Sequence, residues 1–199
     1  MQTVRLDVVV AFSEEEKFYL KNKFSEMCAP AMTGDRKLFD GLCETIPGFC
    51  EEIYQIGKKA TWPSNLGWTR HQAPFDPVIY SVGASISAHI LPLYRNYTAK
   101  SEVLHKMVCD IIAKEKYKGG RYSFITEIWP KTKRTDGVDI PKLFTEVNAG
   151  TQAVVALLKF RDGRFVKEVR ELQTKFTKET WIVWRKKVAL YLERYGNQE

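Results

Sequence analysis

The sequence contains no hydrophobic stretch long enough to span a membrane and no cysteine pairs of the kind that bind zinc. Its longest apolar run, residues 8–12, falls far short of the about 20 residues that cross a bilayer. Cys28, Cys43, Cys50 and Cys109 include no C-x-x-C pair, and the three histidines lie outside close ligand spacing with them. The first absence argues against a transmembrane helix, and the second favours buried, reduced thiols over a metal site.

Signatures of common enzymes are also missing. The chain has no P-loop, no dinucleotide-binding glycine fingerprint, no H-E-x-x-H motif and no nucleophile elbow. An acid–base pair remains open, either His71 with Asp76 or His89 with His105, although three histidines in 199 residues will often lie near a carboxylate by chance. We therefore expect a protein that is not an enzyme and that needs no cofactor.

Composition favours a folded protein. Hydrophobic residues make up 44% of the chain and aromatic residues 13%, which disfavours intrinsic disorder. The 199 residues suffice for one domain or for two small lobes. Because the N-terminal residues lack the charged segment and apolar core of a signal peptide, we expect a cytoplasmic protein with no membrane partner.

The chain does have an uneven distribution of charge. Residues 114–199 carry 19 Lys and Arg against 11 Asp and Glu, whereas residues 1–113 carry 12 against 13. The net charge of +7 therefore comes from the C-terminal part of the sequence. Because a positive field concentrated on one region attracts polyanions, nucleic acid is the first partner to consider.

Helical patterns dominate the first third of the chain. Ser13 and Glu16 match a capping box, which predicts a helix over residues 14–28. Apolar residues at helical spacing then predict two short helices, one stopped by Pro47 and the other near Gly57.

Two segments of this region are not helical in pattern. Residues 4–8 alternate between apolar and charged side chains, which predicts a short strand or an extended arm. Residues 61–77 combine proline, glycine and aromatic residues and predict an irregular packed loop. The loop is a candidate boundary between an N-terminal arm with a small helical lobe, residues 1–75, and a basic helical lobe, residues 76–199, although one continuous domain also fits.

The remainder of the chain is again predominantly helical. Asp76 and Pro77 predict the start of a long helix kinked at Pro92, and Ser101 predicts the cap of the next. Residues 121–129 alternate with period two and predict a strand or an extended segment. Further helices are predicted over residues 140–149, 152–160, 164–174 and 178–195. The expected fold class is mainly α, as one domain or two lobes.

Basic and aromatic residues are interleaved in the C-terminal part, a composition typical of proteins that bind single-stranded nucleic acid. The candidate binding residues are Lys114, Lys116, Tyr117, Lys118, Arg121, Tyr122, Lys131, Lys133, Arg134, Arg161, Arg164, Lys167, Arg170, Lys186 and Lys187. Among them, Arg164, Lys167 and Arg170 recur every three residues and predict one basic helix face. The alternative is a solvated surface with intrahelical ion pairs, because isolated charge runs are usually of that kind.

Aromatic residues have two different expected roles. Tyr117 and Tyr122 flank a Gly-Gly pair within the first basic group and are the candidates for base stacking. Trp181 and Trp184 belong to a pattern repeating at three and four residues, which is typical of a buried helix face, so we expect them in the core.

The order of elements from residue 78 to residue 195 resembles the nucleoproteins of segmented negative-strand RNA viruses of the orthobunyavirus type. The similar parts are the helix over 78–97, the segment 122–129 before Pro130, the run 154–160 followed by 161–174, and the closing 177–181 with Lys186 and Lys187. The resemblance implies a two-lobed helical protein that holds single-stranded RNA in a basic cleft and assembles head to tail through terminal arms, within a virion or ribonucleoprotein. A helical adaptor whose basic face binds an acidic protein partner, and a basic enzyme on an unusual fold, stay open as alternatives.

Overall fold

The computed structural model describes residues 4–9, 11–61, 73–177 and 180–196. These residues form helices and irregular connections without a strand, so the expected fold class, mainly α, is confirmed for this part of the chain. None of the helices in these ranges combines the length and the apolarity that crossing a membrane requires.

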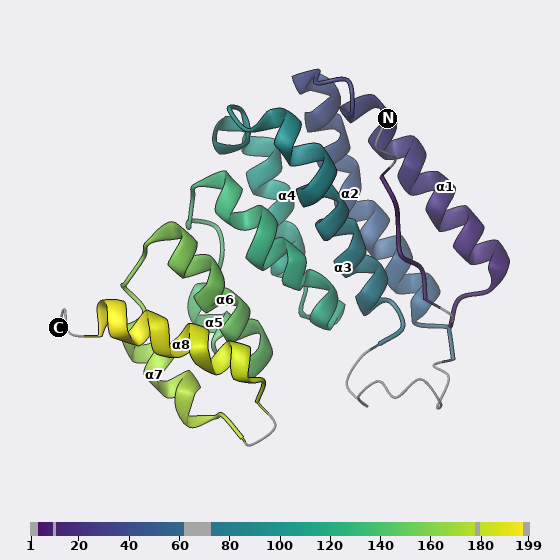
Figure 1. The fold of residues 1–199 in the computed structure, drawn as a ribbon. Coiled ribbons are helices and arrows are strands. Elements are labelled where there is room, and N and C mark those ends of the chain that lie inside the picture. Colours follow the sequence, from purple (N-terminus) through teal and green to yellow (C-terminus); the bar gives the residue numbers. More distant parts are fainter. Residues whose placement is uncertain (1–3, 10, 62–72, 178–179, 197–199) are drawn as a thin grey trace. The chain divides into compact units, whose positions relative to one another are not determined.

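The chain divides into two compact units, which Figure 1 shows as a ribbon. Unit 1 is Met1–Arg134 and unit 2 is Thr135–Glu199. The division lies well beyond the 61–77 loop from which the sequence analysis separated two lobes. Residues 62–72 of that loop lie outside the described residues.

Two long helices open unit 1. Helix α1 spans Glu14–Ala31 and starts with the expected capping box, in which the Ser13 hydroxyl accepts from the Glu16 amide and the Glu16 carboxylate accepts from the Ser13 amide. Helix α2 spans Arg36–Gly57 and continues through Pro47, so the prediction of two short helices was wrong. Apolar side chains on both sides of the proline are buried against α1 and α4, and this packing outweighs one missing backbone hydrogen bond.

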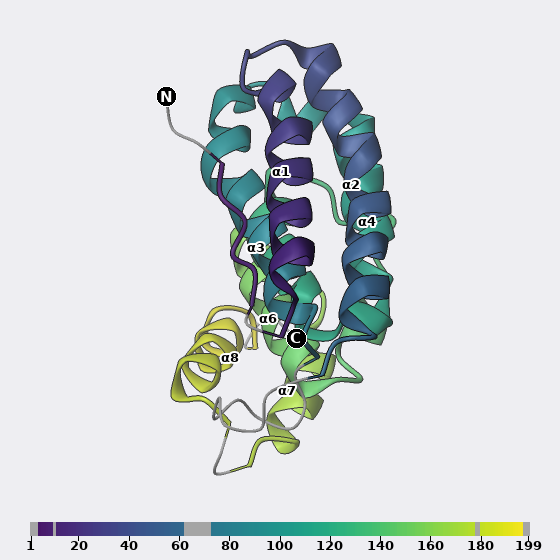
Figure 2. The same ribbon diagram turned by 90° about the vertical axis from the view of Figure 1, so that its right-hand side faces the viewer.

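The rest of unit 1 is made of shorter elements. They are α3 (Asp76–Ser85), η1 (Ile86–Ile90), η2 (Leu91–Tyr94), η3 (Thr98–Lys100), α4 (Glu102–Ile112), η4 (Glu115–Arg121), η5 (Phe124–Ile128) and η6 (Trp129–Thr132). Ser101 caps α4, as predicted, by accepting from the Leu104 amide. Figure 2 shows α1, α2 and α4 side by side in this unit, and α2 contacts both of the others.

Two of these elements, η1 and η5, are π-helical turns, and each is followed by a proline in the next element, Pro92 or Pro130. In both turns the last amide before the proline donates to the carbonyl five residues earlier. The expected break at Pro92 is therefore a change of helix type. The expected extended segment over 121–129 was wrong, because these residues are helical and bury apolar side chains of both alternating sets.

Asp76 joins α3 to η4. The sequence predicts a helix start at Asp76, and Asp76 is the first residue of α3; its buried carboxylate accepts from the Gly120 and Ala73 amides at 3.4 Å each. Gly120 allows this close approach, since a Cβ there would lie 2.8 Å from the Cβ of Ile79. The pair fixes η4 against α3.

The N-terminal segment is extended and lies along its own unit. Val4 and Leu6 are buried, whereas Arg5 and Asp7 between and beyond them are exposed. The Ser85 hydroxyl donates to the Arg5 carbonyl at 2.6 Å, and Figures 1 and 2 show the segment beside α1 and α3. Of the two predicted forms, an arm is correct and a strand is not.

Unit 2 contains four helices among its described residues, and their apolar faces pack on one another. They are α5 (Ile140–Leu143), α6 (Val147–Phe160), α7 (Val166–Thr174) and α8 (Ile182–Tyr195). Gly163 lies in the turn before α7, where a Cβ would come within 2.7 Å of the Tyr195 ring. Trp181 is 63% exposed and Trp184 half-buried, so the expectation of a Trp181–Trp184 core was wrong; Val188, Tyr191 and Tyr195 form the buried face of α8.

Candidate nucleic-acid interface

Two predicted binding residues lie inside unit 1 and not on its surface. Tyr117 is 2% exposed, and its hydroxyl donates to the Glu51 carboxylate at 2.9 Å. Arg121 is 1% exposed and donates to the carbonyl of Ile112 at 2.8 Å. Neither side chain is available to a nucleic acid in this structure, which corrects the sequence analysis at both positions.

Lys116 is also committed to the fold. Its Nζ lies 2.7 Å from the Glu51 carboxylate and over the Tyr54 ring at 4.7 Å from the centroid. Hydrogen bonding from Lys116 and Gln55 lowers the pKa of Glu51 to about 2. The group connects η4 to α2, so it explains the lysine as a structural partner of a carboxylate.

The other predicted residues near η4 and η6 differ in their surroundings. Lys114 and Lys118 are exposed, and Tyr122 is half-buried beside Gly119. Arg134 donates to both carboxylate oxygens of Glu102 at 2.6 Å. Its charge is therefore largely neutralised within unit 1.

Lys131 and Lys133 line a hollow together with a residue that the sequence analysis did not select, Arg95. This hollow, named the phosphate hollow below, has a volume of about 430 Å³. Its lining is Ser87, Leu91, Pro92, Arg95, Thr98, Ala99, Lys131 and Lys133. Lys133 ends η6 in the left-handed conformation, with φ of 58°.

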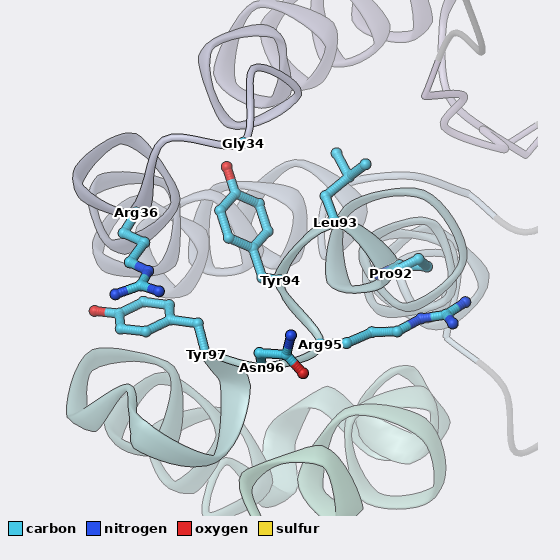
Figure 3. Close-up of a pocket in the computed structure, with 8 residues that line it drawn as sticks. All are labelled: Gly34, Arg36, Pro92, Leu93, Tyr94, Arg95, Asn96 and Tyr97. Carbon is cyan, nitrogen blue, oxygen red and sulfur yellow. The ribbon is translucent and has the colours of Figure 1, made fainter.

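A second hollow adjoins the first and shares Pro92 and Arg95 with it. This one, named the tyrosine hollow, has a volume of about 390 Å³ and is drawn in Figure 3. Its lining is Gly34, Arg36, Pro92, Leu93, Tyr94, Arg95, Asn96 and Tyr97. The Arg36 guanidinium lies over the Tyr97 ring, 5.1 Å from its centroid.

The charged side chains that line the two hollows are all basic. Arg36, Arg95, Lys131 and Lys133 are all exposed, and among the described residues none of them forms an ion pair. No described carboxylate lines either hollow. Four cations without an ion pair to a described residue, around adjoining concave surfaces, can hold a chain of phosphates.

Arg36 and Arg95 are not among the residues predicted from the sequence, because both lie in the part of the chain with no net positive charge. The corner between α1 and α2 brings Arg36 beside the turn that carries Arg95. The Tyr94 hydroxyl fixes this contact by donating to the carbonyls of Ala31 at 2.5 Å and Asp35 at 3.0 Å. No local sequence signal reports a pairing of that kind.

In unit 2, the predicted basic face does not exist as one helix surface. Arg164 precedes α7 and pairs with Asp162 at 2.7 Å, whereas Lys167 and Arg170 lie on α7. Arg170 donates to the Gly196 carbonyl at 2.8 Å. Arg164 does not form the intrahelical ion pair that was the alternative from the sequence, because helix α7 begins only at Val166.

The remaining predicted residues of unit 2 are on its surface. Arg161 is exposed and ends α6 in the left-handed conformation, with φ of 60°. Lys186 is exposed on α8 and Lys187 half-buried. These residues add positive charge to unit 2, but none of them lines the two hollows.

The thiols and histidines provide no metal site in the described ranges, where no three His, Cys, Asp or Glu side chains could hold an ion. Cys28, Cys43 and Cys50 are buried free thiols, as expected, and burial raises the pKa of Cys28 to about 12. His105 lies 3.6 Å from the sulfur of Cys109, and His71 lies outside the described residues.

Comparisons with models of protein families, with curated proteins and with solved structures find no match for this chain. The likeness to orthobunyavirus-type nucleoproteins therefore stays a prediction from the order of elements.

Proposed function

We propose that this chain is a nucleoprotein-type protein that binds single-stranded RNA with little sequence preference, self-assembles along it, and uses the two hollows of unit 1 as its binding surface. The observation that carries the proposal is the convergence of Arg36, Arg95, Lys131 and Lys133 around adjoining hollows that no described carboxylate lines. Cations without internal partners interact with a polyanion at little cost to the fold.

The expected binding mode is electrostatic and tolerant of sequence. Each neutralised phosphate changes the slope of log K against log salt by roughly −0.7 on a single strand. Phosphates carry no sequence information, so contacts made by lysine and arginine alone position the strand without selecting bases. Binding should therefore weaken steeply as the salt concentration rises.

Fluorescence anisotropy with a labelled RNA of roughly 30 nucleotides at several salt concentrations tests the proposal. The triple variant Arg95→Ala, Lys131→Ala, Lys133→Ala should bind at least roughly tenfold more weakly and flatten the salt slope by about 2. The matched control is Lys58→Ala, Lys59→Ala, Lys106→Ala, which removes the same charge from exposed positions outside both hollows.

The outcomes separate the classes of function. Equal weakening in the two triple variants would mean that overall charge, and not these hollows, attracts RNA. Absence of RNA binding at low salt would overturn the proposal and make an adaptor for an acidic protein the better account of the charge.

A further inference from the structure

We infer that the tyrosine hollow is a subsite for an unstacked nucleobase, with the cation–π pair of Arg36 and Tyr97 as its platform, and that the phosphate hollow holds an adjacent phosphate. The inference rests on the proposed function and deepens it, because it names which part of a nucleotide each hollow receives. It also makes the surface specific for single strands, since bases in a duplex are already stacked and paired.

The Tyr97 ring of this platform is held in place before any ligand arrives. The Tyr97 hydroxyl donates to one carboxylate oxygen of Asp40 at 2.5 Å, and the Ser101 hydroxyl donates to the other at 2.7 Å. The Phe39 ring meets the Tyr97 ring edge-on, with centroids 6.1 Å apart. A ring fixed at its hydroxyl and at its edge has little conformational freedom left to lose on binding.

The chemistry of the platform suits a base. A guanidinium lying on an aromatic ring keeps its own plane parallel to a stacking partner, and nucleobases stack on arginine planes as well as on aromatic rings. Leu93, 49% exposed, lines the same hollow and offers apolar contact. The Asn96 side chain, drawn in Figure 3, supplies an amide with both donors and an acceptor, so it can bond to any of the four base edges.

The two hollows adjoin, so one continuous strand can occupy both. Arg95 and Pro92 line both, so a phosphate among Arg95, Lys131 and Lys133 lies next to whatever occupies the tyrosine hollow. Base stacking uses the plane of the Arg36 guanidinium, whereas phosphate recognition uses the positive charge of the lining residues, so a substitution that keeps the charge separates the two.

The test compares RNA with a polyanion that has no bases. Wild-type protein and Arg36→Lys are titrated with a labelled homopolymeric RNA of roughly 30 nucleotides and, in competition, with inorganic polyphosphate of similar length. Arg36→Lys keeps the charge and removes the planar group, so RNA affinity should fall about 5-fold to 10-fold while polyphosphate affinity stays unchanged. The double variant Lys131→Ala, Lys133→Ala should weaken both ligands.

A spectroscopic readout accompanies the affinities. RNA that contains 2-aminopurine should change its fluorescence on binding to wild type, and this change should be smaller with Arg36→Lys. The control Arg194→Lys, an exposed position on α8, should behave as wild type in all assays. Thermal midpoints confirm that each variant is folded.

Each result has a defined meaning. If Arg36→Lys binds RNA as wild type does while the lysine variant is weakened, the base subsite is wrong and the proposed function stands. If Arg36→Lys weakens RNA and polyphosphate equally, the guanidinium of Arg36 binds a phosphate and not a base, which also overturns the subsite. If wild-type protein does not bind RNA at all, the proposed function fails and the subsite with it.

Discussion

Asp76 shows how burial changes the chemistry of one side chain. Its carboxylate is 4% exposed, and burial raises its pKa to about 6. Because this value lies above the pKa of an unfolded aspartate, the folded state takes up the proton first as the pH falls through 6. Protonation of Asp76 therefore increases the free energy of unfolding as the pH is lowered from 8 to 5.

We expect this gain to be about 1 kcal/mol for the wild type and to disappear in Asp76→Asn. Thermal unfolding at pH 8 and pH 5 measures it, with Asp110→Asn on the exposed side of α4 as the control. Glu51 does not interfere, since its lowered pKa affects stability only as the pH falls below about 4.5. A pH dependence that survives in Asp76→Asn would show that another group is responsible.

The tryptophans give a second prediction for single residues. Trp181→Ala should change the free energy of unfolding by less than about 1 kcal/mol, because the side chain is mainly in solvent. Trp129→Ala should cost about 3–5 kcal/mol, because Trp129 is fully buried and its indole donates to the Arg134 carbonyl at 2.9 Å. Chemical denaturation of both variants gives the comparison, and similar losses would contradict the exposure of Trp181.

The sequence predicts single residues well only where the signal is local. Ser13 with Glu16, and Ser101, are capping patterns that need no knowledge of the rest of the chain, and both caps are present. Arg36 and Arg95 line one hollow only because α1, α2 and the turn after η2 pack together. The prediction that Arg121 binds nucleic acid was wrong because a basic residue within a basic run gives no local sign that its side chain is buried.

At the scale of elements, the N-terminal segment is the part that we expect to move between copies. Exchange of an arm preserves its contacts while it links neighbours, which is the logic of domain swapping. Deleting residues 1–9 should lower the free energy of unfolding by about 3–6 kcal/mol, because the burial of Val4 and Leu6 contributes about 1.5–3 kcal/mol each. It should also shift the protein toward monomer.

Light scattering measures the mass and circular dichroism the stability. The variant Val4→Ser, Leu6→Ser keeps the length of the arm and should show both effects. A fall in stability without any change in mass would mean that the segment only covers its own unit.

The sequence predicts where helices form better than it predicts where they are interrupted. The periodicity of apolar residues located most helices, but proline was given too much weight at Pro47 and alternation too much weight over 121–129. Long-range packing explains both errors, because α2 is buried on either side of its proline and η5 is buried on several faces. A period-two pattern of aromatic and β-branched residues cannot be distinguished from a buried helix by sequence alone.

At the scale of the whole molecule, the net charge is shared more evenly between the two structural units than between the two parts of the sequence compared above. Residues 135–199 carry 12 Lys and Arg against 9 Asp and Glu, and residues 1–134 carry 19 against 15. The strongly basic stretch, residues 114–134, belongs to unit 1. The two units are therefore similarly basic, and the position of the charge within each unit matters more than the total.

A comparison between the units follows from this distribution. Replacing Arg164, Lys167 and Arg170 with Ala should weaken RNA binding less than the triple variant of the phosphate hollow, because Arg164 and Arg170 already bind groups within unit 2. Anisotropy at one low salt concentration, with thermal midpoints as the control for folding, measures both. A larger effect in unit 2 would move the binding surface there.

Three basic residues have a positive backbone φ angle, and this predicts the outcome of a selection experiment on variants. The non-glycine residues with positive φ in the described ranges are Lys118, Lys133 and Arg161, all basic, although glycine adopts this conformation at least cost. Under selection for heat resistance alone, glycine should become enriched at position 133. Under selection for capture of RNA, lysine should persist there, since its charge faces the phosphate hollow. A library of variants at position 133, sorted once for heat resistance and once for RNA binding, should therefore show opposite preferences for glycine and lysine.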